Sequence, residues 1–204
     1  MADGEEKPLR KVAEAFEELQ TIVNSQPQEL GLALLCNACS LILPFFVGLG
    51  IALKFAEMDY VSKVEDLCEA SKTIISVQSM IDQDIQHNTV KKCGSNSRNL
   101  LRVKRALDMM KVLFEQILAT EGNSLKCSAS TAYTQVFAAH HGFAIRKAAT
   151  AGMLLLPTKS RFLTMLNEDG PTAELYMQRY VIASAPVLEY IDNLFHSREL
   201  GVDW

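Results

Sequence analysis

The sequence lacks an excess of positive charge. Its 204 residues include 20 Lys and Arg against 24 Asp and Glu, which gives a formal net charge of −4. Proteins that bind nucleic acid over a broad surface need a surplus of basic side chains to neutralise phosphates. The composition therefore argues against a broad DNA- or RNA-binding surface, and we expect no nucleic acid among the partners. Any cationic site must be local.

The sequence is also poor in the features of secreted, metal-binding and catalytic proteins. Five cysteines, an odd number spread over the chain, do not resemble a disulfide framework. Cys36 and Cys39 form a C-x-x-C pair without a second pair or a nearby His, so we interpret them as core residues. The N-terminal segment has no apolar core of the kind found in secretory signals, which favours the cytosol. Without a Gly-rich phosphate loop or a nucleophile elbow, an enzyme is a weak hypothesis.

One uncharged run, from Leu30 to Leu53, is long enough to cross a bilayer as a helix. Pro44 lies near its middle and would interrupt a continuous helix, and Gly48 and Gly50 follow. The flanks also lack an asymmetric cluster of Lys and Arg. We therefore predict two buried helices that meet near Pro44. The alternative, an integral membrane protein, would be excluded by solubility without detergent.

Most of the remaining chain has helical periodicity, and no segment shows sustained alternation with a period of two. Ser95, Asn96 or Ser97 is predicted to cap a long helix that follows Gly94. Further helices are predicted at about 130–156, 160–167, 171–183 and 186–198. Since there is no repeat, low-complexity tract or long linker, we predict a single all-α domain over residues 1–204, with roughly eight or nine helices.

The predicted long helix opens with two arginines one turn apart, in the segment RNLLRVKRALDMM. Its apolar face, which we expect to meet the core, comprises Leu100, Val103, Leu107, Met110, Phe114, Ile117 and Leu118. A mixed-charge face, interpreted as solvated, comprises Lys104, Asp108, Lys111 and Glu115. A third strip runs from Arg98 and Arg102 to Ala106, Met109 and Leu113, so it begins cationic and ends apolar.

Such a strip matches an amphiphile with an anionic head. Cations near a helix N-terminus face the positive end of the helix dipole, and a bound anion removes that penalty. The alternative is that Arg98 and Arg102 pair with surface carboxylates. Asp59 and Lys63, four residues apart, are likewise either a surface pair or an acceptor beside a phosphate-binding cation. In the segment AAHHGF, adjacent histidines point in different directions on a helix, which disfavours a metal pair.

Together, Asp59 and Lys63 in KFAEMDYVSK, Arg98 and Arg102 in RNLLRVKRAL, and His141 in HHGF resemble the headgroup site of the glycolipid transfer protein family. The chain is most similar to the ceramide-1-phosphate transfer branch. This resemblance implies a two-layer sandwich of about eight helices that encloses one lipid, with no enzymatic activity, metal or cofactor. It also implies that Asp59 accepts hydrogen bonds from the amide and hydroxyl of ceramide, that His141 donates to the acyl-amide carbonyl, and that Lys63, Arg98 and Arg102 hold the phosphate.

Arg102 is the position that discriminates between lipid headgroups. Sugar-carrying members of the family resemble one another in having a Trp there, on which a hexose can stack, whereas a cation suits a phosphate of about −1.5 to −2 charges. Where the family commonly has a second Trp, the sequence HGF has Phe143, which bears on packing more than on lipid class. The candidate lining of a pocket for the hydrocarbon chains, each member of which also suits an ordinary core, is Phe45, Phe46, Phe55, Met109, Leu113, Phe143 and Met153.

The resemblance thus predicts a monomeric, cytoplasmic carrier that binds ceramide-1-phosphate or phytoceramide-1-phosphate and moves it between membranes, which it contacts transiently and peripherally. Similarity to plant members implies a role in regulating cell death. Two alternatives remain: a helical adaptor that binds an acidic protein partner through the basic strip, and a lipid sensor rather than a transporter.

Overall fold

The computed structural model describes residues 7–25 and 29–204, and this part of the chain is all-α. It contains ten α-helices and three 3-10 helices, and its only β-type pairings are isolated bridges from Gly31 to Ser76 and from Ser124 to Thr158. The α-helices are α1 Pro8–Asn24, α2 Leu32–Ser40, α3 Leu43–Leu49, α4 Lys54–Ala70, α5 Val77–Gln86, α6 Asn96–Ala119, α7 Lys126–Val136, α8 Phe143–Gly152, α9 Lys159–Met165 and α10 Gly170–His196. The 3-10 helices are η1 Ile51–Leu53, η2 Ala138–His140 and η3 Met153–Leu155.

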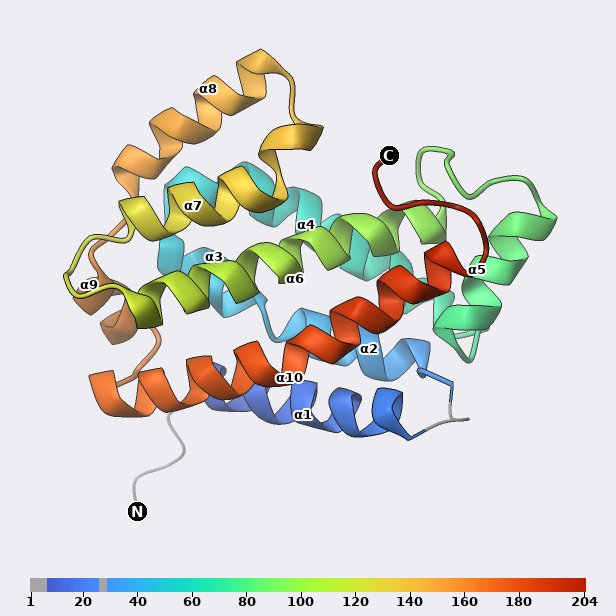
Figure 1. The fold of residues 1–204 in the computed structure, drawn as a ribbon, viewed down its shortest axis with the longest axis horizontal. Coiled ribbons are helices and arrows are strands. Elements are labelled where there is room, and N and C mark those ends of the chain that lie inside the picture. The colour runs from blue at the N-terminus through green and yellow to red at the C-terminus, as the bar shows by residue number, and fades with distance from the viewer. Residues whose placement is uncertain (1–6, 26–28) are drawn as a thin grey trace.

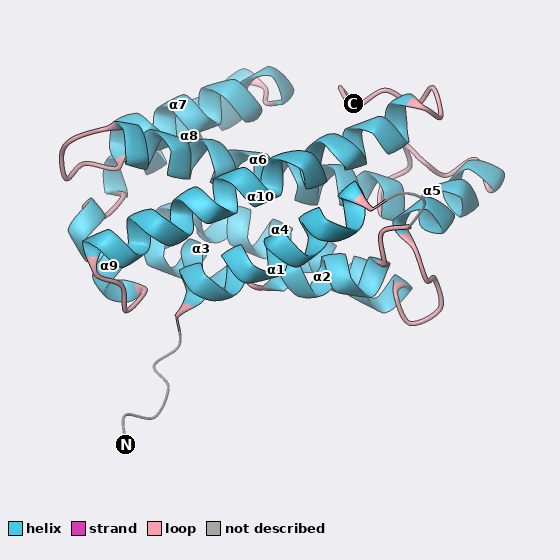
Figure 2. Ribbon diagram, turned by 60° about the horizontal axis from the view of Figure 1, so that its bottom comes forward, coloured by secondary structure: helices cyan, strands magenta, loops and turns pink. Residues whose placement is uncertain are grey.

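The helices form two layers with α6 at the centre (Figure 1). In that view α7 and α10 flank α6, while α2, α3 and α4 lie behind it; the turned view shows the same separation (Figure 2). α6 contacts α4, α5, α7 and α10, and α1 packs along α10. The predicted two-layer helical sandwich is therefore confirmed, with a few more helices than expected.

A chain of aromatic rings connects the two layers. Phe45 of α3 meets Phe114 of α6 edge to face at 5.5 Å, Phe114 meets Tyr180 of α10 at 5.5 Å, and Tyr180 meets Phe16 of α1 at 4.9 Å. Each such pair contributes about 0.5–1.5 kcal/mol beyond the burial of its apolar area. The predicted apolar face of α6 is confirmed, because Leu100 and its partners on that face are buried, except for the half-buried Leu118.

The long uncharged run forms two short helices, as predicted. Residues Leu32–Leu49 are apolar and numerous enough for a membrane span, with a mean hydropathy of 2.2, but 56% of them are buried inside the protein. α2 ends at Ser40, and Pro44 lies in the first turn of α3, where the missing N–H has no cost. The run supplies side chains to the core, including the fully buried Ile42 and Phe45.

Three of the predicted helices are wrong in extent. The segment 130–156 is divided into α7, η2, α8 and η3, because His141 and Gly142 adopt extended conformations at ψ 132° and 167°. Conversely, 171–183 and 186–198 belong to the single helix α10, which contains Pro186 in its interior. Pro186 leaves the carbonyl of Ile182 without its helical donor. Ile182 is exposed, so water can reach that carbonyl while α1 and α6 support the helix on both sides of the proline.

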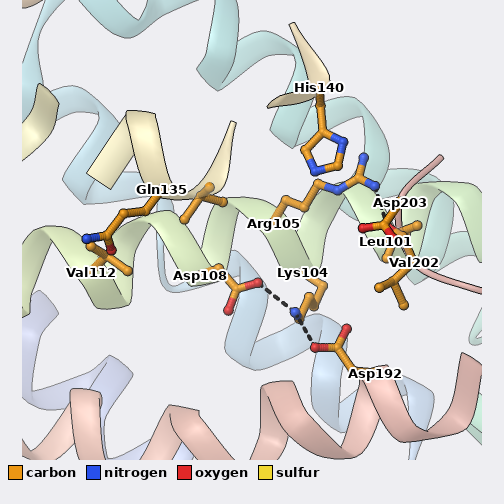
Figure 3. Close-up of a pocket in the computed structure, with 11 residues that line it drawn as sticks. Leu101, Lys104, Arg105, Asp108, Val112, Gln135, His140, Asp192, Val202 and Asp203 are labelled. Carbon is orange, nitrogen blue, oxygen red and sulfur yellow. Dashed lines mark hydrogen bonds and ion pairs between the residues drawn. The ribbon is translucent and has the colours of Figure 1, made fainter. Parts of the chain in front are cut away.

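The mixed-charge face of α6 is not solvated as predicted. Lys104 is only 12% exposed, and its Nζ lies 2.7 Å from Asp108 Oδ2 and 2.6 Å from Asp192 Oδ2 of α10 (Figure 3). The neighbouring α10 packs against α6 and covers the first part of this face. Further along, Lys111 and Glu115 form an ordinary pair one turn apart at 2.7 Å.

Candidate functional site

Packing of α4 against α6 brings three of the five predicted headgroup residues into one cluster. Asp59 Oδ1 lies 2.7 Å from Lys63 Nζ on the next turn of α4, and Asp59 Oδ2 lies 3.8 Å from Arg102 Nη1 on α6. The Asp59 and Arg102 side chains are 53% and 43% exposed, whereas Lys63 is 18% exposed. One carboxylate therefore faces two cations at the surface, and the cluster carries a net positive charge.

Arg98 adds a third cation at the start of α6. Ser95 caps the helix by accepting a hydrogen bond from the Arg98 N–H at 3.2 Å, which confirms the predicted cap. The Arg98 guanidinium donates to the Lys91 carbonyl oxygen at 3.1 Å. In the described part of the chain no carboxylate lies within ion-pair distance of it, so the alternative of surface carboxylate pairing does not hold for Arg98. Both arginines occupy the first two turns of α6, where the helix dipole favours a bound anion.

His141 lies near Arg102, in the extended segment between η2 and α8. Its Nδ1 lies 2.9 Å from the Tyr133 hydroxyl, and its ring stacks on Phe137 with centroids 5.3 Å apart and planes 15° apart. Burial, followed by the charges of His140, Arg102 and Arg105, lowers the pKa of His141 below its usual value. His141 is therefore a neutral imidazole at neutral pH, able to donate one hydrogen bond.

The seven candidate lining residues separate into two groups. Phe55 and Phe143 are 88% and 69% exposed, so the structure places them at the surface. The interior group, buried apart from the half-buried Met109, consists of Phe45, Phe46, Met109, Leu113 and Met153. Contact with hydrocarbon chains stays a prediction for all seven.

A groove of about 360 Å³ lies along α6, next to the strip that begins with Arg98 and Arg102. None of the predicted site residues lines this groove. Figure 3 shows Lys104, Arg105 and Asp108 of α6 facing His140, Asp192 of α10 and the C-terminal segment. Arg105 donates to the carbonyl oxygens of Val202 and Trp204 at 2.6 and 2.8 Å. The C-terminal segment thus engages a third arginine of α6, and no spacing in the sequence connects positions so far apart.

A set of exposed apolar side chains on contacting elements was also missed. The elements that carry it contact one another, because α3 meets α9 and η1, η1 meets α4 and η3, and η3 meets α8. We call it the apolar end surface; it consists of Val47, Ile51, Phe55, Met58, Phe143, Ile145, Leu154, Leu155 and Met165. Lys54, Arg146 and Lys147 are exposed on the same helices. No residue of α8 is buried, although its sequence is as apolar as that of a core helix.

Comparison with known proteins gives four consistent matches. The family model described as glycolipid transfer protein (GLTP) matches residues 30–168. Accelerated cell death 11 from Arabidopsis thaliana is 57% identical over 100% of both chains, and ceramide-1-phosphate transfer protein from Danio rerio is 29% identical over 64% of this chain and 68% of its own. The structure of a mutant of Arabidopsis accelerated cell death 11 in complex with C12 ceramide-1-phosphate superposes with a TM-score of 0.96, at 56% identity and over 100% of both chains.

Proposed function

Because the chain belongs to the glycolipid transfer protein family, we propose that it binds ceramide-1-phosphate and carries it between membranes. A mutant of the 57% identical relative has a structure with ceramide-1-phosphate bound. The relative from Danio rerio is named ceramide-1-phosphate transfer protein. The observation that carries the proposal is the cluster of Lys63 and Arg102 around Asp59, with Arg98 one turn before Arg102 on α6.

The charges of this cluster suit a phosphate monoester better than a neutral sugar. Three cations and one carboxylate leave a surplus of two positive charges, close to the about −1.5 to −2 charges of a phosphate. A phosphate that binds Lys63 and Arg102 replaces Asp59 as their partner. The Asp59 carboxylate is then free to accept from neutral donors, and the amide N–H and hydroxyl of ceramide are such donors. We therefore assign the phosphate to Lys63, Arg98 and Arg102, and the ceramide amide region to Asp59 and His141.

The apolar end surface accounts for contact with membranes. Exposed aromatic and aliphatic side chains next to Lys54, Arg146 and Lys147 suit the interface of a bilayer, where apolar groups enter the acyl region and cations meet anionic headgroups. Removal of hydrocarbon from water gains about 0.8 kcal/mol per methylene, so the lipid needs a continuous apolar path from membrane to protein. We propose that this contact is transient and peripheral, on cytoplasmic membrane surfaces.

We extend the proposal to the domain organisation, the oligomeric state, the activity and the cellular role of the protein. We treat residues 1–204 as a single domain that acts as a monomer and whose activity is physical transfer, with no covalent step, metal or cofactor. The name of the 57% identical relative supports a role in the regulation of cell death. The sensor alternative uses the same binding site, so net movement of lipid distinguishes it from transfer.

The proposal is tested by transfer of fluorescent ceramide-1-phosphate between vesicles, with glucosylceramide in parallel. We expect selective transfer of the phosphate lipid by the wild type. Arg102→Trp removes hydrogen bonds to a charged group worth about 1.5–3 kcal/mol, so ceramide-1-phosphate affinity should fall roughly tenfold or more. Asp59→Ala should slow transfer, because it removes the acceptor for the ceramide amide while the cations that hold the phosphate remain.

The matched control is Arg10→Trp, the same substitution at an exposed position of α1, where Arg10 pairs with Glu14 at 2.8 Å. It should leave transfer unchanged. Equal transfer of glucosylceramide and ceramide-1-phosphate by the wild type would contradict the phosphate assignment. Transfer of neither lipid would overturn the carrier function and favour a protein partner for the basic strip.

A further inference from the structure

We propose that Tyr133 is a positioning residue for lipid recognition. Its hydroxyl donates to His141 Nδ1 and thereby fixes the tautomer in which Nε2 carries the proton and donates a hydrogen bond to the lipid carbonyl. The effect on lipid binding rests on the proposed function, whereas the hydrogen bond and the tautomer are properties of the lipid-free protein. Tyr133 belongs to α7, and it was not among the residues predicted from the sequence.

The contact itself is well defined. The Tyr133 oxygen and His141 Nδ1 are 2.9 Å apart, and their rings are tilted by 43° with centroids 5.6 Å apart. Phe137, one turn after Tyr133, stacks on the imidazole at 5.3 Å with planes 15° apart. One helix end therefore supplies both a hydrogen bond in the ring plane and a flat surface against its face. Because His141 lies in an extended segment, no helical backbone contact fixes this ring.

The direction of the hydrogen bond follows from which atoms of Tyr133 and His141 carry a proton at neutral pH. His141 is neutral, because burial and the nearby cations lower its pKa, so exactly one ring nitrogen carries a proton. Burial raises the pKa of Tyr133, so its hydroxyl keeps its proton at neutral pH. If Nδ1 carried the imidazole proton, the Tyr133 hydroxyl would need a different acceptor. The described part of the chain provides none within hydrogen-bond distance, and Tyr133 is only 8% exposed.

The opposite arrangement satisfies both groups. With the Tyr133 O–H donating to Nδ1, the hydroxyl is paired within the protein and the imidazole proton resides on Nε2. Within the described residues Nε2 has no hydrogen-bond partner, and Arg102 is close enough to His141 to lower its pKa. Nε2–H is therefore an unused donor beside the cationic cluster. A carbonyl such as that of an acyl amide is the acceptor it fits, whereas the other tautomer would present a lone pair and repel that carbonyl.

The test uses Tyr133→Phe, which removes the hydroxyl and keeps the ring against Phe137. Tyr190→Phe is the matched control, since the Tyr190 hydroxyl pairs with Gln78 away from the headgroup residues. Two readouts are needed. Nitrogen-15 chemical shifts of His141 in the lipid-free protein report which nitrogen carries the proton, and titration with ceramide-1-phosphate in phosphatidylcholine vesicles gives the affinity.

We expect the wild type and Tyr190→Phe to show a protonated Nε2 and an unprotonated Nδ1, and Tyr133→Phe to show a mixture of tautomers. Tyr133→Phe should weaken lipid binding by roughly three- to tenfold, the range expected for one neutral hydrogen bond. In a His141→Ala background the same substitution should have no further effect. A purely structural role of Tyr133 would weaken binding in both backgrounds.

The outcomes separate this inference from the proposed function. A protonated Nδ1 in the wild type, or equal loss of affinity in the presence and absence of His141, would overturn the positioning role while the carrier function stands. Failure of the wild type to bind ceramide-1-phosphate would overturn the carrier function, and the chemical shifts would still decide the tautomer.

Discussion

At the scale of single residues, the structure contrasts two acidic side chains. Asp59 is half exposed and has two cationic partners, so it is well placed to exchange them for a ligand. Glu168 has a fully buried side chain, and neither of its carboxylate oxygens accepts a hydrogen bond from the described residues. Its nearest countercharge is Lys7, with Nζ 3.6 Å from Oε2. The first arrangement suits binding, and the second reduces stability.

We predict that Glu168→Gln stabilises the protein at neutral pH. Burial raises the pKa of Glu168 above its ordinary value of 4.5, so the native state holds this proton more tightly than the unfolded state. Stability is therefore lost as pH rises from about that value through the raised pKa, and the glutamine variant escapes this loss. The gain should be about 1 kcal/mol, because the variant buries a neutral amide instead of a charged carboxylate whose oxygens accept no hydrogen bond from the described residues.

Thermal unfolding of both proteins across the acidic to neutral range measures the effect, and the difference in Tm should grow with pH. Glu174→Gln is the control, because Glu174 is 58% exposed and its partner Lys159 is 3.5 Å away. A glutamine variant that melts below the wild type at pH 7 would show that the ion pair with Lys7 outweighs the burial cost.

The residues of the candidate site were predictable where a side-chain type and a helical spacing sufficed. Asp59 and Lys63, and Arg98 and Arg102, are each four apart, so the sequence alone places each pair on one helix face. The contact of Asp59 with Arg102 depends on packing between two helices, and only the family resemblance indicated it. Tyr133 and the C-terminal contacts of Arg105 were missed, because each depends on where the chain turns after a helix ends.

At the scale of helices, local signals predicted two helix starts correctly. Pro44 and Ser95 mark the beginnings of α3 and α6 as expected, since a missing N–H and a side-chain cap act locally. Pro186 was misleading, because tertiary contacts of α10 with α1 and α6 compensate for a local break. No proline lies between α7 and α8, so the sequence carried no proline that would predict this break.

Close approach of α3 to α9 leads to a prediction about helix packing. A Cβ at Gly48 would lie 3.0 Å from two ring carbons of the fully buried Phe162. Alanine favours a helix interior over glycine, but here the clash should dominate, and we expect Gly48→Ala to destabilise the protein by about 1–3 kcal/mol. Denaturant unfolding measures this change.

Gly170→Ala is the matched control, since a Cβ at the first residue of α10 meets no atom within 4 Å. Its unfolding midpoint should equal or slightly exceed that of the wild type. Unchanged stability of Gly48→Ala would mean that α9 moves away from α3 at little cost.

At the scale of the whole molecule, apolar side chains are unevenly distributed over the surface. Nine of the exposed large hydrophobic residues belong to the apolar end surface, and cations of α4 and α8 accompany them. Burial of α8 against a bilayer would cover side chains that the protein interior does not. The net charge of −4 makes this local basic region important, because the molecule as a whole is repelled by anionic lipids.

We predict that removal of two cations from α8 weakens binding to anionic membranes selectively. Arg146 and Lys147 are exposed on a helix without buried residues, so the double substitution Arg146→Gln and Lys147→Gln leaves the core intact. Each cation near an anionic surface contributes about 1 kcal/mol, so partitioning onto anionic vesicles should fall roughly thirtyfold at low salt. Vesicle co-sedimentation with anionic and neutral lipids measures it.

Lys72→Gln with Lys92→Gln is the control, because both lysines are exposed but lie outside the apolar end surface. It should bind anionic vesicles like the wild type. Equal weakening by the two double variants would indicate that overall charge rather than this surface governs membrane contact.

Because no side chain of α8 is buried, the free energy needed to displace α8 is separate from the free energy of global unfolding. An aromatic chain from Phe45 to Phe16 holds the two layers together, and α8 takes no part in it. Displacement of α8 breaks little apolar contact, so its free energy of opening should be far smaller than that of global unfolding. Amide hydrogens of α8 should therefore exchange with solvent much faster than those of α6. Evolution can then adjust the rate at which cargo enters and leaves by changing α8, while the melting temperature of the protein stays nearly constant.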